Sequence, residues 1–221
     1  MIPFDFIYCR PTTLQEAIEA WWKLKSEGKS ALYYAGGSET ITLCRVGAIS
    51  PDAVIDIKLI PELTKMAADR TFLHIGAACT LNQIKESNHF KLLGLACGRI
   101  ADHTNQCRIT LAGNLCGTII YRETSLPLLC CDASVTLFGP DGERILPMQS
   151  IFGEQIKLFP GELVTAVHIP SWALDAPYAH IKKAANEKST IRSPVSPRCK
   201  KTGLSVRLFR AFAPTPFGVK K

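Results

Sequence analysis

Residues 33–40 read Tyr-Tyr-Ala-Gly-Gly-Ser-Glu-Thr, and this stretch decides how the chain is interpreted. The apolar residues 31–34 predict a β-strand, the two glycines predict a turn, and a short helix is expected from Glu39. Glycines permit positive φ and let backbone N–H groups approach an anion, and a helix N-terminus favours a phosphate. The alternative is a structural turn without a ligand. The candidate ligand loop consists of Tyr33, Tyr34, Ala35, Gly36, Gly37, Ser38, Glu39 and Thr40.

A second candidate segment follows about 75 residues later, where residues 110–114 read Thr-Leu-Ala-Gly-Asn. An Asn after a Gly within an apolar run is unusual for a simple strand. It suggests a tight backbone segment in which Asn114 connects loops or contacts a ligand. A bulge with a self-satisfied Asn is the alternative. Neither segment is a G-x-G-x-x-G or Walker motif, so a Rossmann or P-loop site is not supported.

The rest of the chain alternates strands with helices. Residues 134–138 and 144–146 flank Gly-Pro-Asp-Gly, which predicts a β-hairpin. Further strands are expected at 6–9, 53–57, 71–78 and 163–169, and helices after Thr13, after Thr80 and within 90–101. This mixture, without an internal repeat, predicts an α+β or mixed α/β fold.

The 221-residue chain has the composition of an ordinary globular protein, with 47% hydrophobic and 20% charged residues. No apolar run approaches the roughly 18 residues of a membrane span. The first residues lack the regions of a signal peptide. We therefore expect a soluble, cytoplasmic protein without membrane attachment.

The net charge of +7 is unevenly distributed. Residues 1–180 hold 15 Lys/Arg and 18 Asp/Glu, whereas residues 181–221 hold 11 Lys/Arg and one acid, Glu187. The basic tail could bind nucleic acid without sequence preference, but it has few aromatic residues and no recognised motif. We therefore expect no nucleic-acid partner.

Cysteine and histidine patterns give no sign of a metal site. The nine cysteines include no C-x-x-C pair, and the five histidines show no ligand spacing. Most of these cysteines, including the neighbouring pair at 130 and 131, are expected to be buried hydrophobes. We expect no metal site in this chain.

Several segments together resemble the FAD-binding (medium) subunit of molybdenum hydroxylases, of the xanthine dehydrogenase and carbon monoxide dehydrogenase type. They are the opening residues 6–17, the two candidate segments, Leu-Leu-Cys-Cys-Asp-Ala at 128–133 and Gly-Glu-Leu-Val at 161–164. The resemblance covers about residues 3–188 in order and spacing. It implies a two-lobed α+β FAD-binding domain of the vanillyl-alcohol-oxidase (PCMH) type over residues 1–180, with the pyrophosphate of the flavin on the Gly-rich loop.

The resemblance also implies which residues contact FAD. The family's first loop falls on residues 33–40 and its second on 110–114, with Thr110, Ala112, Gly113 and Asn114 as contacts. An acidic contact falls on Glu123, where relatives usually have Asp. An apolar contact falls on Ile100, a backbone contact on Val164, and a lysine near the flavin on Lys182.

Two departures from the family pattern bear on affinity. Relatives usually read Thr-Ile-Gly-Gly-Asn, and Ala112 stands at the first of these glycines. If that position requires positive φ, its Cβ costs on the order of 1 kcal/mol. In addition, the family's usual Ser-Pro is replaced by Ile119-Ile120. We therefore expect weaker FAD binding or a rearranged loop.

The resemblance implies a division of labour among subunits. A large subunit with a molybdenum cofactor oxidises the substrate, and a small subunit with two [2Fe–2S] clusters relays electrons. FAD on this chain then passes them to NAD⁺ or another acceptor. No catalytic residue for hydroxylation is expected here, because the chain's role is to bind and tune the flavin.

The last 41 residues depart from the family, whose members continue into a C-terminal α+β domain. We expect residues 181–221 to be a poorly ordered basic tail. A frameshift near Lys188 is one hypothesis, because codons for residues 188–194, read two bases on, can encode Ile-Asp-Tyr-Pro-Leu, as in relatives. The alternative to a working FAD subunit is a truncated remnant that does not bind FAD stably.

Overall fold

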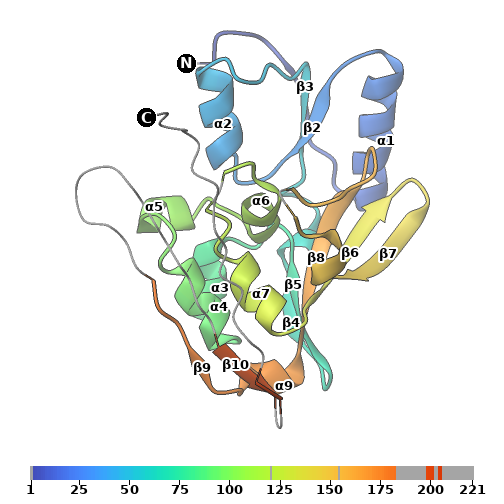
Figure 1. Cartoon of the computed structure of the whole chain (residues 1–221). Helices are drawn as coiled ribbons and strands as arrows, with labels where there is room; N and C mark the ends of the chain where they lie inside the picture. Colours follow the sequence, from blue (N-terminus) through green and yellow to red (C-terminus); the bar gives the residue numbers. More distant parts are fainter. Residues whose placement is uncertain (1, 120, 154, 183–197, 202–203, 206–221) are drawn as a thin grey trace, which may run out of the picture.

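A small parallel sheet forms the first part of the fold in the computed structural model, which describes residues 2–119, 121–153, 155–182, 198–201 and 204–205. Its strands pair in the order β1 (Ile7–Cys9), β3 (Ala53–Asp56) and β2 (Ala31–Tyr34) (Figure 1). Helix α1 (Leu14–Ser26) connects β1 to β2, since parallel strands need a crossover. Helix α2 (Ser38–Arg45) follows β2 directly, so the predicted sequence of strand, glycine turn and helix is confirmed.

A five-stranded antiparallel sheet forms the second part. Its order is β4 (Met66–Ala68), β5 (Phe72–Gly76), β8 (Leu163–Pro170), β6 (Ser134–Gly139) and β7 (Gly142–Pro147). The hairpin of β6 and β7 closes with Gly139 opposite Gly142, as its turn sequence predicts. The register between β6 and β8 shifts at Thr136, which marks an irregularity in the ladder.

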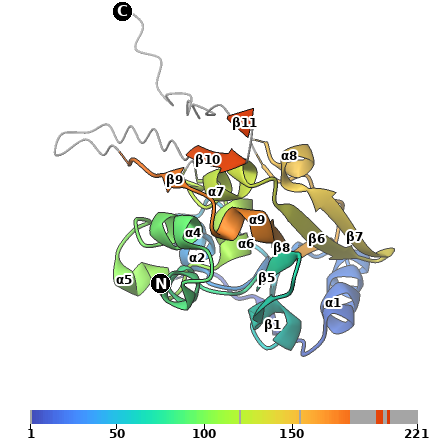
Figure 2. The same ribbon diagram turned by 90° about the horizontal axis from the view of Figure 1, so that it is seen from below.

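Short helices surround this sheet (Figures 1 and 2). They are the 3₁₀ turn η1 (Pro61–Thr64) and the helices α3 (Leu81–Ser87), α4 (Lys91–Cys97), α5 (His103–Gln106), α6 (Leu111–Cys116), α7 (Ser125–Cys130), α8 (Met148–Ile151) and α9 (Ser171–Leu174). Of these, α3, α4, α5, α6 and α7 lie together beside the sheet. A third small sheet has the order β11 (Leu204–Ser205), β10 (Arg198–Lys201) and β9 (Tyr178–Ala179).

Helix α6, which contains most of the second candidate segment, lies between the two larger sheets (Figure 1). Its first residues are hydrogen-bonded to the segment that follows β5. The N–H of Leu111 donates to the carbonyl of Cys79 at 2.9 Å, and the N–H of Ala112 donates to that of Ala77 at 3.0 Å. Leu111 and Leu115 are fully buried in a hydrophobic core that also includes Ile55 from the parallel sheet. The core is therefore continuous from one sheet to the other, and α6 contributes to it.

The tight backbone segment predicted at 110–114 is helical rather than a bulge. This stretch is a capped helix: the hydroxyl of Thr110 accepts a hydrogen bond from the N–H of Gly113 at 3.2 Å. Ala112 lies inside that helix, and the described non-glycine residues with positive φ are Asn88, Ala101 and Asp132. The strain expected for a Cβ at position 112 is therefore absent.

Most of the basic tail lies outside the described residues. The structure does not describe residues 183–197, 202–203 and 206–221. The frameshift proposed near Lys188 therefore lies outside the described residues. In the part that it does describe, no helix has the length and apolar character needed to cross a lipid bilayer.

Candidate functional site

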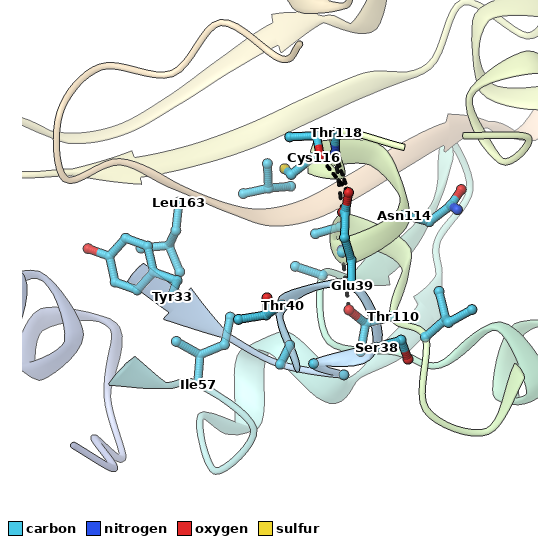
Figure 3. A pocket seen from close by; sticks show the side chains of 18 of the residues that line it. Tyr33, Ser38, Glu39, Thr40, Ile57, Thr110, Asn114, Cys116, Thr118 and Leu163 are labelled. Carbon is cyan, nitrogen blue, oxygen red and sulfur yellow. Dashed lines mark hydrogen bonds between the residues drawn. The ribbon is translucent and has the colours of Figure 1, made fainter. Parts of the chain in front are cut away.

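The part of the fold with the parallel sheet and the part with the five-stranded antiparallel sheet are its two lobes. A pocket of about 700 Å³ is lined by residues of both (Figure 3). This volume is typical of small-molecule sites, and segments far apart in the sequence line it. The sequence-predicted residues in its wall are Tyr33, Ala35, Gly36, Gly37, Ser38, Glu39, Thr40, Thr110, Ala112, Gly113, Asn114 and Val164. Both candidate segments therefore contribute to one pocket.

The two glycines of the first loop are required by their surroundings. A Cβ on Gly36 would lie 2.0 Å from the carbonyl oxygen of Arg108, so only glycine lets the loop approach that backbone. Gly37 has φ +71° and is the N-cap of α2. Because L-residues rarely adopt this conformation, glycine sets the direction in which α2 leaves the strand.

The first turn of α2 presents donors to the pocket. The first intrahelical partner of this helix is the carbonyl of Gly37, which accepts from the N–H of Ile41 at 2.8 Å. The preceding N–H groups of a helix have no partner within the helix. Within the described part of the chain, the buried hydroxyl of Ser38 also has no hydrogen-bond partner. An unpaired buried hydroxyl beside a helix N-terminus matches the oxygen atoms of an anionic ligand such as a phosphate.

Glu39 connects the first loop to the segment that follows α6. Its carboxylate accepts hydrogen bonds from the N–H of Thr118 at 3.0 Å, from the hydroxyl of Thr118 at 2.5 Å and from the N–H of Ile119 at 2.9 Å (Figure 3). These donors offset the negative charge that Glu39 brings to the first turn of α2. The altered segment at Ile119 is thus held as one wall of the pocket.

The second segment is held by side-chain hydrogen bonds. A Cβ on Gly113 would lie 2.7 Å from the hydroxyl oxygen of Thr110, so glycine leaves room for the hydroxyl that caps α6. The amide of Asn114 donates to the carbonyl of Tyr121 at 3.2 Å, and its oxygen accepts from the hydroxyl of Thr124 at 2.6 Å. Asn114 therefore connects loops, the first of the two roles predicted for it, and it also lies in the pocket wall.

The opposite side of the pocket is apolar. The ring of Tyr33 lies beside Leu163 (Figure 3), and the Tyr33 hydroxyl donates to the carbonyl of Gly161 at 2.7 Å. Burial raises the pKa of Tyr33, so the phenol stays protonated. Next to Leu163, burial alone would raise the pKa of Glu162, but a two-pronged ion pair with Arg144 at 2.6 and 2.7 Å holds it below its usual range.

Four predicted residues lie outside the pocket wall: Tyr34, Ile100, Glu123 and Lys182. The ring of Tyr34 instead faces the ammonium of Lys58 at 4.5 Å. Glu123 is buried and forms an ion pair with Lys182 at 3.0 Å, and Lys182 also donates to the carbonyl of Arg99. The acidic and basic residues expected near the flavin therefore pair with each other.

About half of the residues in the pocket wall were not predicted from the sequence. Leu163 adjoins the predicted Val164, so the segment 161–164 already contained the signal that would have found it. No local signal marks Thr118, because its place depends on a partner 79 positions earlier. The missed residues are Thr42, Leu43, Ile57, Ala77, Ile109, Cys116, Thr118, Ile119, Leu158, Glu162 and Leu163.

The described residues contain no group of three or more His, Cys, Asp or Glu side chains arranged to hold a metal ion. The donors of the pocket are hydroxyl and backbone N–H groups. These groups suit phosphate oxygens, and the apolar side suits a planar ring. The residues present therefore fit a dinucleotide such as FAD.

Comparison with known proteins identifies the family. Residues 3–172 match the model of the FAD binding domain in molybdopterin dehydrogenase. The chain is 29% identical over 189 residues to the carbon monoxide dehydrogenase medium chain of Afipia carboxidovorans, with 82% of this chain and 64% of that protein covered. It is also 29% identical over 227 residues to a putative xanthine dehydrogenase FAD-binding subunit of Escherichia coli, with 96% and 76% covered.

Solved structures agree on the fold. The carbon monoxide dehydrogenase structure from Hydrogenophaga pseudoflava superposes with a TM-score of 0.81 at 24% identity, covering 94% of this chain and 74% of that one. Quinoline 2-oxidoreductase from Pseudomonas putida 86 gives 0.79 at 20% identity, covering 93% and 72%. The expected α+β FAD-binding fold of the PCMH type is confirmed. The chain belongs to the FAD-binding domain family of the molybdopterin dehydrogenases.

Proposed function

We propose that this chain binds FAD in the pocket between its lobes and serves as the electron-transferring flavin subunit of a molybdenum-containing hydroxylase. One observation supports this proposal most strongly. The Gly36–Gly37 turn, the first turn of α2 and the unpaired hydroxyl of Ser38 all line one pocket. When bound, FAD supplies an isoalloxazine ring that can take up and pass on electrons.

Each side of the pocket has its own task in this proposal. The first turn of α2 and the Ser38 hydroxyl hold the diphosphate, because they offer donors at the positive end of a helix. The apolar side near Tyr33 and Val164 excludes water from a ring of the cofactor. Family resemblance extends the contacts to Tyr34, Ile100, Glu123 and Lys182, which lie beyond the pocket wall.

The proposed partners follow from the relatives. A large subunit with a molybdenum cofactor oxidises the substrate, and a small subunit with [2Fe–2S] clusters delivers electrons to this chain. The electrons leave to NAD⁺ or another acceptor, and a xanthine dehydrogenase-like complex is the assembly we favour. This chain alone does not hydroxylate. We place the complex in the cytoplasm, a location that suits the free thiols of Cys9, Cys44, Cys79 and Cys97.

An absorption spectrum of the purified chain, with and without added FAD, tests the proposal. Flavin bands that survive desalting are the expected result. Two matched variants locate the site, because Gly37 and Gly47 flank α2 and have nearly equal φ of +71° and +73°. We expect Gly37→Ala to abolish FAD retention and Gly47→Ala, with open space around its Cβ, to preserve it.

Two results would contradict the proposed FAD site. A chain that folds by circular dichroism yet takes up no FAD contradicts the proposal and identifies the protein as a remnant of a flavin subunit. Equal FAD retention by the Gly37→Ala and Gly47→Ala variants would mean that the flavin binds elsewhere.

A further inference from the structure

Tyr33 places a large aromatic ring in the wall of the pocket. It stands near the end of β2, and its ring lies beside Leu163 on the apolar side, opposite Glu39 and Thr118 (Figure 3). Other apolar side chains of this side are Ile57 and Val164. A flat, apolar surface of this kind is suited to packing against another planar ring.

The hydroxyl of Tyr33 fixes that ring in place. It donates at 2.7 Å to the carbonyl of Gly161, which belongs to the other lobe, 128 positions later in the chain. Gly161 itself has little freedom: its φ is +80°, and a Cβ there would lie 3.0 Å from the ring of Trp21 and 3.1 Å from that of Trp22. The acceptor is therefore held by packing on α1, and the bond spans the two lobes.

We propose that Tyr33 is a positioning residue: its ring, held between the lobes by Gly161, is the platform on which a planar heteroaromatic ring of the bound dinucleotide packs. This inference rests on the proposed FAD function and goes beyond it in assigning the contact. The hydroxyl reaches protein and not ligand, so its contribution is rigidity, which lowers the entropy lost on binding.

Two rings of FAD share the required chemistry, the isoalloxazine and the adenine. Both are planar and heteroaromatic, and either could pack on a phenol ring. Partial ligands distinguish them, because ADP contains only the adenine and FMN only the isoalloxazine. Fluorescence adds a second criterion, because a phenol stacked on isoalloxazine quenches flavin emission.

The experiment measures the Kd of the full chain for FAD, ADP and FMN in four variants. Tyr33→Leu removes the platform, and Tyr33→Phe keeps it but removes the hydroxyl. Tyr178→Leu and Tyr178→Phe are the matched controls, since Tyr178 is an exposed tyrosine on β9 outside the pocket wall.

We expect Tyr33→Leu to weaken FAD about tenfold or more, Tyr33→Phe to weaken it less, and both controls to bind like the wild type. Packing on isoalloxazine predicts weaker FMN, unchanged ADP and brighter bound flavin in Tyr33→Leu. Packing on adenine predicts weaker ADP, with FMN and flavin emission unchanged. Either pattern supports the proposal.

Unchanged Kd values for all three ligands in Tyr33→Leu would overturn it. If Tyr33→Leu does not fold, Tyr33→Phe decides, because a wild-type FAD affinity there refutes the role of the bond to Gly161. A wild-type chain that binds no FAD refutes the proposed function instead, so the two failures are distinguishable.

Discussion

Glu39 holds Thr118 across the pocket: its carboxylate accepts from both the backbone N–H and the hydroxyl of Thr118, at 3.0 and 2.5 Å. The two residues lie 79 positions apart and belong to the segments after β2 and after α6. This contact joins the first loop predicted to bind FAD to the segment that follows the second one. It also gives Glu39 a role that its place in the glycine loop did not reveal.

Removing the Glu39 carboxylate should release the pocket wall. We expect Glu39→Ala to weaken FAD binding by about tenfold, since an unheld Thr118–Ile119 segment must be ordered by the ligand. Unfolding free energy should fall by only about 1 kcal/mol, because water can reach the released donors. Titration with FAD and urea denaturation measure the two effects.

Glu39→Gln keeps one acceptor oxygen and should lie between the wild type and Glu39→Ala. The control is Glu19→Ala, which removes an exposed carboxylate that binds Gln15 on α1. Equal FAD affinity in Glu39→Ala and Glu19→Ala would contradict the role assigned to the contact with Thr118.

Restoring the family glycine at position 112 should not help this protein. Ala112 is the second residue of α6 and has no positive φ, so Ala112→Gly should cost up to about 1 kcal/mol of stability, the loss of helix propensity from Ala to Gly. Urea denaturation measures it. Ala20→Gly in α1 is the control, because Ala20 is also half-buried in a helix, and a similar loss is expected. A stabilised Ala112→Gly variant would show that the native Ala112 is strained.

Asn114 should be important for stability as well as for the site. Asn114→Ala leaves the fully buried hydroxyl of Thr124 without its acceptor and the carbonyl of Tyr121 without its donor. We expect a loss of about 1–3 kcal/mol in the free energy of unfolding, measured in urea. Asn105→Ala, an exposed Asn that contacts Asp102, should lose much less. Comparable losses in the two variants would argue against a buried connection at Asn114.

A row of hydrogen-bonded side chains across the antiparallel sheet should make stability depend on pH. His168 contacts His74 at 2.6 Å and Thr136 at 2.5 Å, and His74 contacts Asp69 at 2.8 Å. Burial, followed by repulsion from His74, lowers the pKa of His168 below its usual 6.5. The unfolded chain therefore takes up a proton that the folded chain resists, and stability falls as pH drops through about 6.5.

Urea denaturation between pH 7.5 and 5.5 checks this prediction. His168→Gln should give a shallower loss of stability on acidification than the wild type, since one titrating group is gone. The control His89→Gln changes an exposed histidine outside this row and should keep the wild-type slope. The lowered pKa of Asp69 acts in a separate window, because that carboxylate takes up a proton only below pH 4. An unchanged slope in His168→Gln would refute the assignment to His168.

Local chemistry explains the parts of the fold that could be predicted. The hairpin of β6 and β7 follows from its Gly-Pro-Asp-Gly turn. The β2–α2 unit follows from the positive φ of residue 37, which glycine adopts more readily than other residues. The sequence left the conformation of residues 110–114 open, because Gly and Asn have low helix propensity. The cap from Thr110 and the burial of Leu111 and Leu115 outweigh that preference.

The sequence by itself determined the α+β class, the family and the two loops that line the pocket, because each depends on residues close together in the chain. Only the tertiary structure decided which side chains meet. Thr118 reaches Glu39, Gly161 holds Tyr33, and Lys182 neutralises Glu123 away from the pocket wall. These pairs are 79, 128 and 59 positions apart. Packing of the two lobes around α6 sets such contacts, and no local pattern of residues specifies them.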